Sequence, residues 1–261
     1  MAERPVFVPA PDSDELVQEV YLPMRWHSGF AVSQKRKNVL ELHRAAAAAG
    51  YSPVLEVSTK STSRLGQHLS AFHLKVSTNE TTLPLENAFQ GSKVFEKGGP
   101  FVDLYHAQPR VAKSDSRLRT SGRLIGFDFK GVKFPAEPMT AFYDWLYIGS
   151  IYPHREWLTR LNRYAAFSDI EFNPERSVNC QARSCALFVS LTLKGVLNES
   201  IKSPEAFLSA IGGGHYGPGH VDRSGQRLLI SDQHAADQSR KASGLTERPR
   251  STKTARNPRR R

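Results

Sequence analysis

The chain has few cysteines: among its 261 residues only Cys180 and Cys185 carry a thiol. Two cysteines are too few for a disulfide framework, and at this spacing on a helix they would point about 140° apart. We therefore expect both thiols to be reduced and buried, which is typical of a cytoplasmic protein.

Long apolar runs are absent as well. The first residues, MAERPVFVPAPDSDE, include acids where a signal peptide needs an apolar core. No stretch approaches the ~18 consecutive apolar residues of a membrane-spanning helix. The sequence thus predicts a cytoplasmic location and no contact with a membrane.

Several familiar catalytic and metal-binding motifs are missing. The sequence contains no G-x-S-x-G, H-E-x-x-H or C-x-x-C, so nothing favours a serine hydrolase, a zinc peptidase or a zinc finger. The stretch IGGGHYGPGH at 211–220 holds two histidines without a supporting cysteine or acidic cluster, and it is more typical of a flexible loop. We expect no metal site and no cofactor.

Positive charge is abundant but unevenly distributed. The net charge is +11, and residues 240–261 contain nine Lys or Arg against one acid, Glu247, which is +8. The other 239 residues therefore carry only +3. We expect residues 236–261 to form a disordered basic tail, which either contacts DNA phosphates weakly or binds nothing. The charge does not make the folded part a DNA reader.

The pattern of hydrophobic residues predicts an α+β protein in which helices dominate. We divide it into an N-terminal arm and helix packed on the domain (1–52), a catalytic domain (53–235) and the tail. Ser33 and Gly50 bound a helix, 123–135 alternates like a hairpin, and a long buried helix precedes Gly195. The remaining expected elements are strands near 52–61 and 70–77, helices at 83–95, 137–152 and 154–167, and an extended piece at 168–172.

The expected helix LPLENAFQGSKVF, residues 83–95, carries a narrow polar stripe. Glu86, Gln90 and Lys93 fall within about 60° on a helical wheel, while apolar residues fill much of the rest. This balance predicts a mostly buried helix whose polar line faces a cleft. A partly desolvated Glu86 would have a raised pKa suited to proton transfer, although a glutamate in a first turn also simply favours the helix dipole.

Asp144 is the only charge within the apolar stretch AFYDWLYI. Acids are rarely buried without a partner, so Asp144 is either catalytic or paired with an arginine such as Arg155. The neighbouring Tyr143 and Trp145 are able to stack on a planar ring, although aromatic residues at helical spacing more often belong to the core.

Two further groups of polar residues are candidates for ligand binding. Asp169 and Glu171 would share one face of a short strand, as paired carboxylates for water activation or as two acids facing solvent. The polar turn STKSTSRLG suits a diphosphate but lacks the glycine spacing of a P-loop. Its hydroxyls and cations are Ser58, Thr59, Lys60, Ser61 and Arg64.

Four ordered blocks, LGQHLSAFHL, LPLENAFQGSKVF, VAKSD and FYDWLY, resemble those of the NADAR (YbiA-like) superfamily. Further blocks resemble more closely the branch encoded beside DarT-type DNA ADP-ribosyltransferase toxins; they are MRWHSGFAVSQKRKN, LEVSTKS and FSDIEFNPERSVNCQAR. The resemblance covers about residues 5 to 198 and implies a NADAR-like α+β fold.

The resemblance implies an N-glycosidase that removes ADP-ribose from guanine bases in DNA and so acts as an antitoxin. ADP-ribosylated DNA would be the substrate and ADP-ribose the product. By position, Glu86, Asp144 and Lys93 would be the catalytic residues, and which acid is the base stays open. Among the expected ligand-binding residues, Lys113 and Trp145 are carried over by position in the family. The full set that we expect is Ser58, Lys60, Ser61, Arg64, Phe72, Phe89, Lys113, Trp145 and Asp169.

One departure affects the expected phosphate contact. The YbiA-type pattern has an arginine shortly before its Asp-Trp pair, where this chain has Phe142 and Tyr143. Lys60 or Arg64 would then take over that contact. Two alternatives remain open: an N-glycosidase acting on a small aminopyrimidine riboside phosphate, and a module that binds ADP-ribose without turnover.

Overall fold

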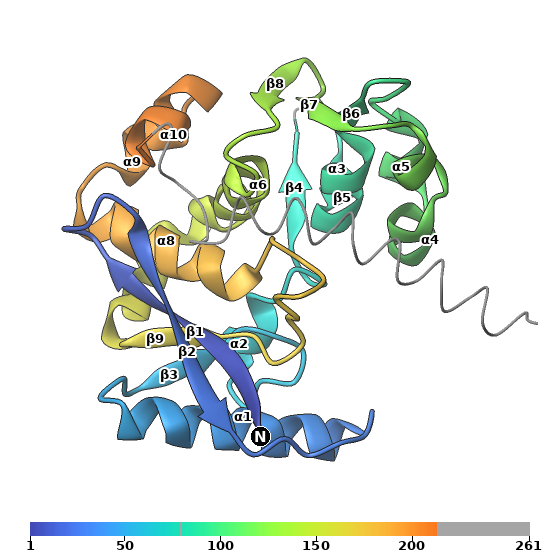
Figure 1. The fold of residues 1–261 in the computed structure, drawn as a ribbon. Coiled ribbons are helices and arrows are strands. Elements are labelled where there is room, and N and C mark those ends of the chain that lie inside the picture. Colours follow the sequence, from blue (N-terminus) through green and yellow to red (C-terminus); the bar gives the residue numbers. More distant parts are fainter. Residues whose placement is uncertain (79, 213–261) are drawn as a thin grey trace, which may run out of the picture.

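The computed structural model describes residues 1–78 and 80–212. It has an α+β fold, as predicted, with helices around three small sheets (Figure 1). The expected tail and most of the glycine-rich loop lie outside the described residues. None of the helices in these residues combines the length and the hydrophobicity of a transmembrane span.

The largest sheet joins the N-terminus to the middle of the chain. Its strand order is β2-β1-β9-β3, with β3 and β9 parallel and the other neighbours antiparallel. Its strands are β1 (Ala2–Ala10), β2 (Leu16–Met24), β3 (Val54–Glu56) and β9 (Ala166–Ser168).

Within the expected N-terminal arm, residues 2–24 form the β1–β2 hairpin. Pro5 and Pro9 lie within β1, although proline cannot donate a hydrogen bond to a neighbouring strand. They are tolerated here because β9 pairs with β1 only at Phe7, so that most of this side of β1 needs no partner.

Helices cover both faces of this sheet (Figure 1). The predicted helix after residue 32 is α1 (Val32–Ala48), which packs on β2 and β3 around Val39 and Leu42. On the other face, α8 (Gln181–Leu193) contacts β1, β2 and β9 and continues into the main core.

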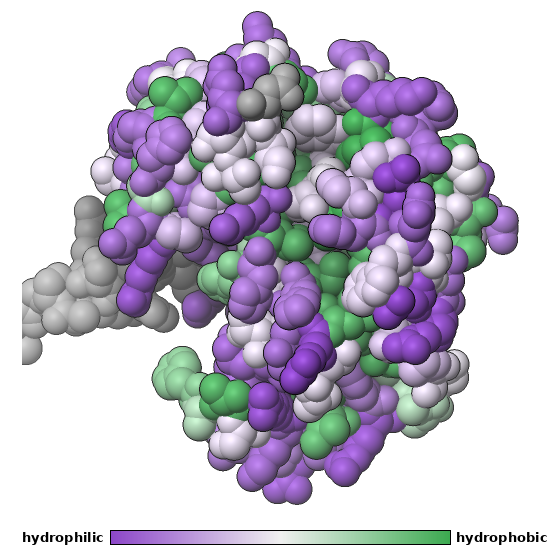
Figure 2. All heavy atoms as spheres, turned by 180° about the vertical axis from the view of Figure 1, so that it is seen from behind, coloured by the Kyte–Doolittle hydropathy of each residue, from purple (hydrophilic) through white to green (hydrophobic). Residues whose placement is uncertain are grey.

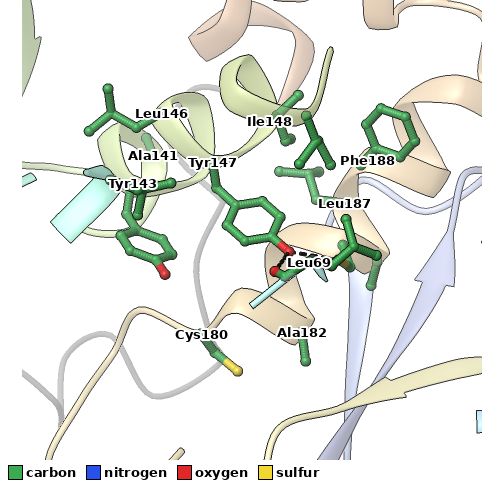
Figure 3. Close-up of a cluster of buried hydrophobic side chains, with 14 of the residues drawn as sticks. Leu69, Ala141, Tyr143, Leu146, Tyr147, Ile148, Cys180, Ala182, Leu187 and Phe188 are labelled. Carbon is green, nitrogen blue, oxygen red and sulfur yellow. Dashed lines mark hydrogen bonds between the residues drawn. The ribbon is translucent and has the colours of Figure 1, made fainter. Parts of the chain in front are cut away.

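The main core is centred on α6 (Ala141–Ile151), where eight of eleven residues are buried, as its nearly continuous apolar surface predicted. Tyr143 and Tyr147 extend from α6 toward the N-terminal end of α8 (Figure 3). The Tyr147 hydroxyl donates to the Leu69 carbonyl at 2.6 Å, which fixes the chain just after α2 (Arg64–His68).

Two small sheets complete the part that positions the candidate site. The predicted hairpin at 123–135 is confirmed as β7 and β8, and β6 pairs with β7. These two sheets consist of β4 (Lys75–Ser77) with β5 (Thr82–Pro84), and of β6 (Lys93–Phe95), β7 (Leu124–Phe129) and β8 (Val132–Pro135). The helices near them are α3 (Leu85–Gly91), η1 (Val102–His106), α4 (Pro109–Ser114) and α5 (Arg117–Thr120).

The amphipathic helix expected at 154–167 is not continuous. It is divided into short turns, and the Thr159 hydroxyl donates to the Glu156 carbonyl at 2.8 Å where one turn meets the next. The short elements of this region and of the C-terminal part are η2 (Tyr152–His154), α7 (Arg155–Leu158), η3 (Thr159–Arg163), α9 (Leu197–Ser200) and α10 (Pro204–Ala210).

Candidate active site

Glu86 lies in the first turn of α3, and it is the one residue of this seven-residue helix that is not buried. Its side chain is held from within the helix, because Gln90 Nε2 donates to Glu86 Oε1 at 2.9 Å. Gln90 itself is buried, so this contact fixes the carboxylate from its protein side. The predicted burial of this helix is confirmed, but its exposed polar line is reduced to Glu86, because Gln90 is buried. The cleft that this line would face stays a prediction.

Our expectation that Lys93 shares the helix with Glu86 is wrong, because α3 ends at Gly91 and Lys93 begins β6. A β-carbon at Gly91 would clash with the ring of Tyr105, so the helix is packed tightly at its end. The Ser92 hydroxyl then donates to the Ala88 carbonyl at 2.6 Å and satisfies the last turn.

Lys93 nevertheless remains next to Glu86. Its ammonium lies 4.7 Å from the centre of the Phe89 ring. Burial lowers the pKa of Lys93 to about 8; the charge of Lys113 also lowers it, while Glu86 raises it. Lys113 is exposed on α4, whose neighbouring Ala112 is buried. The structure therefore brings together Glu86, Lys93 and Lys113 from α3, β6 and α4.

The polar turn at 58–64 differs from its expected form. Ser58 and Ser61 are buried, and both hydroxyls serve the turn itself: Ser58 donates to Glu56 at 2.6 Å, and Ser61 accepts from the Ser63 amide at 3.2 Å. Both hydroxyls thus have a partner within the turn, and their contact with a diphosphate stays a prediction. Lys60 is partly exposed and lies 3.5 Å from Glu171, whereas Arg64 is exposed at the start of α2.

Glu56 has no role in the sequence interpretation, yet it is a central buried acid, 2% exposed. Its carboxylate accepts from the hydroxyls of Ser58 and Ser168, each at 2.6 Å, and from the Ile170 amide at 2.9 Å. Burial raises the pKa of Glu56, and these hydrogen bonds oppose that rise. The available signal was an acid within the apolar run VLEV, the same signal that identified Asp144.

A histidine completes this buried network. Since the Ser168 hydroxyl donates to Glu56, the Nε2–H of His43 on α1 donates to that hydroxyl, at 2.9 Å. Burial lowers the pKa of His43 to about 4, so the ring is neutral near neutral pH. Glu56 thereby links α1, β3 and β9 below the polar turn.

Asp169 and Glu171 do not share a strand face, because β9 ends at Ser168. Asp169 instead closes a turn by accepting from the Glu171 amide at 3.0 Å, and Gln181 Nε2 donates to its other oxygen at 2.9 Å. Burial and then the charge of Glu56 raise the pKa of Asp169. The partly exposed carboxylate of Asp169 is therefore held close to the buried carboxylate of Glu56.

Asp144 is 1% exposed and pairs with Arg183 Nη1 of α8 at 2.9 Å, rather than with the expected Arg155. The Ser184 hydroxyl donates to its other oxygen. Arg155 instead stacks on Tyr152. This buried ion pair ties α6 to α8, which is a structural role, and the catalytic role of Asp144 stays a prediction.

The expected aromatic residues have different environments. Phe89 is 7% exposed and packs against the rings of Phe127, Phe142 and Tyr143, so it is a core residue rather than a free ring beside a ligand. Trp145 is half-buried against Phe134, with ring centres 5.2 Å apart. Phe89 therefore has little free surface for stacking, whereas stacking of Trp145 on a ligand stays a prediction.

Phe72, a few residues after α2, has an exposed side chain, with 76% of its surface accessible. The preceding residue is anchored, because the Ala71 amide donates to Gln181 Oε1 at 2.6 Å. Gln181 therefore holds both the segment that presents Phe72 and the carboxylate of Asp169.

The phenol of Tyr143 lies close to three of these acids, namely Glu86, Asp169 and Asp144. Burial raises the pKa of its phenol well above the usual value, and the charges of Glu86, Asp169 and Asp144 raise it further. The phenol therefore stays protonated, with α3 on one side and the segment after β9 on the other. Chemically, the site combines a half-buried carboxylate, a lysine with a lowered pKa, a phenol and an exposed aromatic ring.

Comparison with known proteins identifies one family. Residues 2–216 match the family described as DarT1-associated NADAR antitoxin. No curated protein matches the chain.

Proposed function

Because the chain belongs to the family of DarT1-associated NADAR antitoxins, we propose that it is an N-glycosidase that removes ADP-ribose from guanine bases in DNA. It would thereby reverse the modification made by the toxin. The observation that carries this proposal is the half-buried Glu86, oriented by Gln90 beside a lysine whose pKa is about 8.

The reaction requires a nucleophile at the sugar and a proton at the leaving base. Water adds its oxygen to the anomeric carbon, the carbon–nitrogen bond breaks, and the guanine nitrogen keeps the electron pair and takes up a proton. Glu86 stabilises the oxocarbenium-like transition state and takes the proton of the water. Lys93 supplies the proton to the leaving nitrogen, a role suited to an ammonium with a pKa of about 8.

We assign the remaining groups to binding. Lys113, Lys60 and Arg64 are the accessible cations for the diphosphate, and Phe72 offers a free ring face to the nucleotide. Asp144 acts on the site indirectly, since its pairing with Arg183 holds α6 and hence Tyr143 in place.

The experiment compares Glu86→Gln with the matched variant Glu96→Gln, which changes an exposed glutamate close in sequence. Purified proteins are incubated with oligonucleotides ADP-ribosylated on guanine or on thymine and with a free riboside phosphate, and released products are quantified. We expect ADP-ribose from the guanine-linked DNA, and a loss of about 10² to 10⁴ in rate for Glu86→Gln alone.

Full activity in a folded Glu86→Gln protein would refute the catalytic assignment. Release from the free riboside phosphate but not from DNA would favour the small-molecule N-glycosidase, and tight binding of intact ADP-ribosylated DNA over hours would favour a binding module.

A further inference from the structure

Residues 25–37, which comprise the loop before α1 and the first six residues of α1, expose an aromatic residue at the edge of the fold. Phe30 is 99% exposed, and Val32, the first residue of α1, is 49% exposed. Hydrophobic residues project at the lower left of Figure 2, at the end of the molecule where α1 begins. We refer to residues 25–37 as the entry segment.

The entry segment is strongly basic. It contains Arg25, Lys35, Arg36 and Lys37 and no acid, which gives a net charge of +4. All residues before 240 together carry only +3. Arg25, Arg36 and Lys37 are exposed. Cations near the start of a helix oppose the helix dipole, so helix stability does not account for this arrangement.

Hydrogen bonds fix the shape of the entry segment. The buried Asn38 accepts from the His27 amide at 2.7 Å and donates to the His27 carbonyl at 2.9 Å. Trp26 lies against Arg4, at 4.7 Å from the guanidinium carbon to the ring centre, and against Lys35 at 5.7 Å. The loop is therefore anchored on both sides while Phe30 remains exposed.

We propose that the entry segment binds the DNA strand that carries the modified guanine. Exposed cations attract phosphates, and an exposed aromatic ring stacks on an unpaired base regardless of its identity. The inference rests on the proposed function, which makes DNA the substrate. It adds a contact to the strand that does not involve the residues assigned to ADP-ribose.

The test compares two double variants of the full chain with the same net charge. Arg36→Gln with Lys37→Gln changes the entry segment, whereas Lys133→Gln with Lys194→Gln removes exposed cations from β8 and from the end of α8. Binding to an unmodified single-stranded oligonucleotide is measured by fluorescence anisotropy over a range of salt concentrations. Turnover is measured on a modified oligonucleotide and on ADP-ribosylated guanosine.

We expect the entry-segment variant to bind DNA on the order of tenfold more weakly than the control, with a salt slope reduced by about 1.4 for two lost phosphate contacts. Its KM for the oligonucleotide should rise, while kcat and turnover of ADP-ribosylated guanosine stay unchanged. Phe30→Ala should weaken binding about fivefold or more, whereas Trp157→Ala, at another exposed aromatic residue, should not.

Equal DNA affinity and equal salt slopes of the two double variants would overturn the inference. It would also be overturned if the entry-segment variant lost affinity for the purified toxin and kept its affinity for DNA. If no variant releases ADP-ribose from either substrate, the proposed function fails, while the anisotropy measurement still decides on the DNA contact.

Discussion

The buried pair of Asp144 and Arg183 allows a quantitative prediction that separates a structural role from a catalytic one. We consider Arg183→Met, which leaves the 1% exposed carboxylate of Asp144 without the guanidinium at 2.9 Å. Breaking a buried ion pair by removing one partner costs about 3–5 kcal/mol. For a chain of this size each kcal/mol lowers Tm by about 2–4 °C, so we expect a decrease of about 6–20 °C.

The double variant Asp144→Asn with Arg183→Met removes both charges at once. Since an unpaired buried charge is then absent, the double variant should recover about 1–3 kcal/mol relative to the sum of the two single changes. Thermal unfolding followed by circular dichroism measures this coupling. The matched control is Arg155→Met, at the partner that the sequence had suggested, which should change stability by about 0.5 kcal/mol or less.

Activity of the double variant decides the role of Asp144. If Asp144 only positions α6, the folded double variant releases ADP-ribose at a rate within about tenfold of the wild type. A loss comparable to that of Glu86→Gln in a protein with restored Tm would refute this reasoning and make Asp144 a proton-transfer group. An unchanged Tm in Arg183→Met would refute the structural argument as well.

Two predictions concern pH. Because Lys93 has a pKa of about 8 and acts as an ammonium, kcat/KM should fall as pH rises through about 8. Lys113→Gln should shift this fall to higher pH, since the charge of Lys113 lowers the pKa of Lys93. A pH–rate profile of the wild type and of this variant checks both expectations. An unmoved alkaline limb would contradict the second. The raised pKa values of Glu56 and Asp169 mean that the folded state binds protons more tightly, so their contribution to stability is complete below about pH 4 and is lost as pH rises through their folded pKa values. Glu56→Gln should therefore flatten the decrease of Tm between pH 5 and 8, and an identical decrease in both proteins would count against the buried acid pair.

Local patterns in the sequence determined much of this protein. The helix after residue 32, the hairpin at 123–135 and the buried helix before Gly195 follow from periodicity and from turn residues, which act over a few positions. The same local reasoning identified α3 as a buried helix with one polar line at Glu86, because its own residues carry both signals.

Only the tertiary structure decided which groups meet. Asp144 pairs with Arg183 rather than with Arg155, which is closer in the sequence. Glu56 lies close to Asp169 because β3 and β9 run side by side. Likewise, the ring of Tyr105 lies so close to Gly91, the last residue of α3, that a β-carbon at Gly91 would clash with it. These contacts join residues far apart in the chain, and their burial, which sets both pairing and pKa, depends on packing that no local pattern encodes.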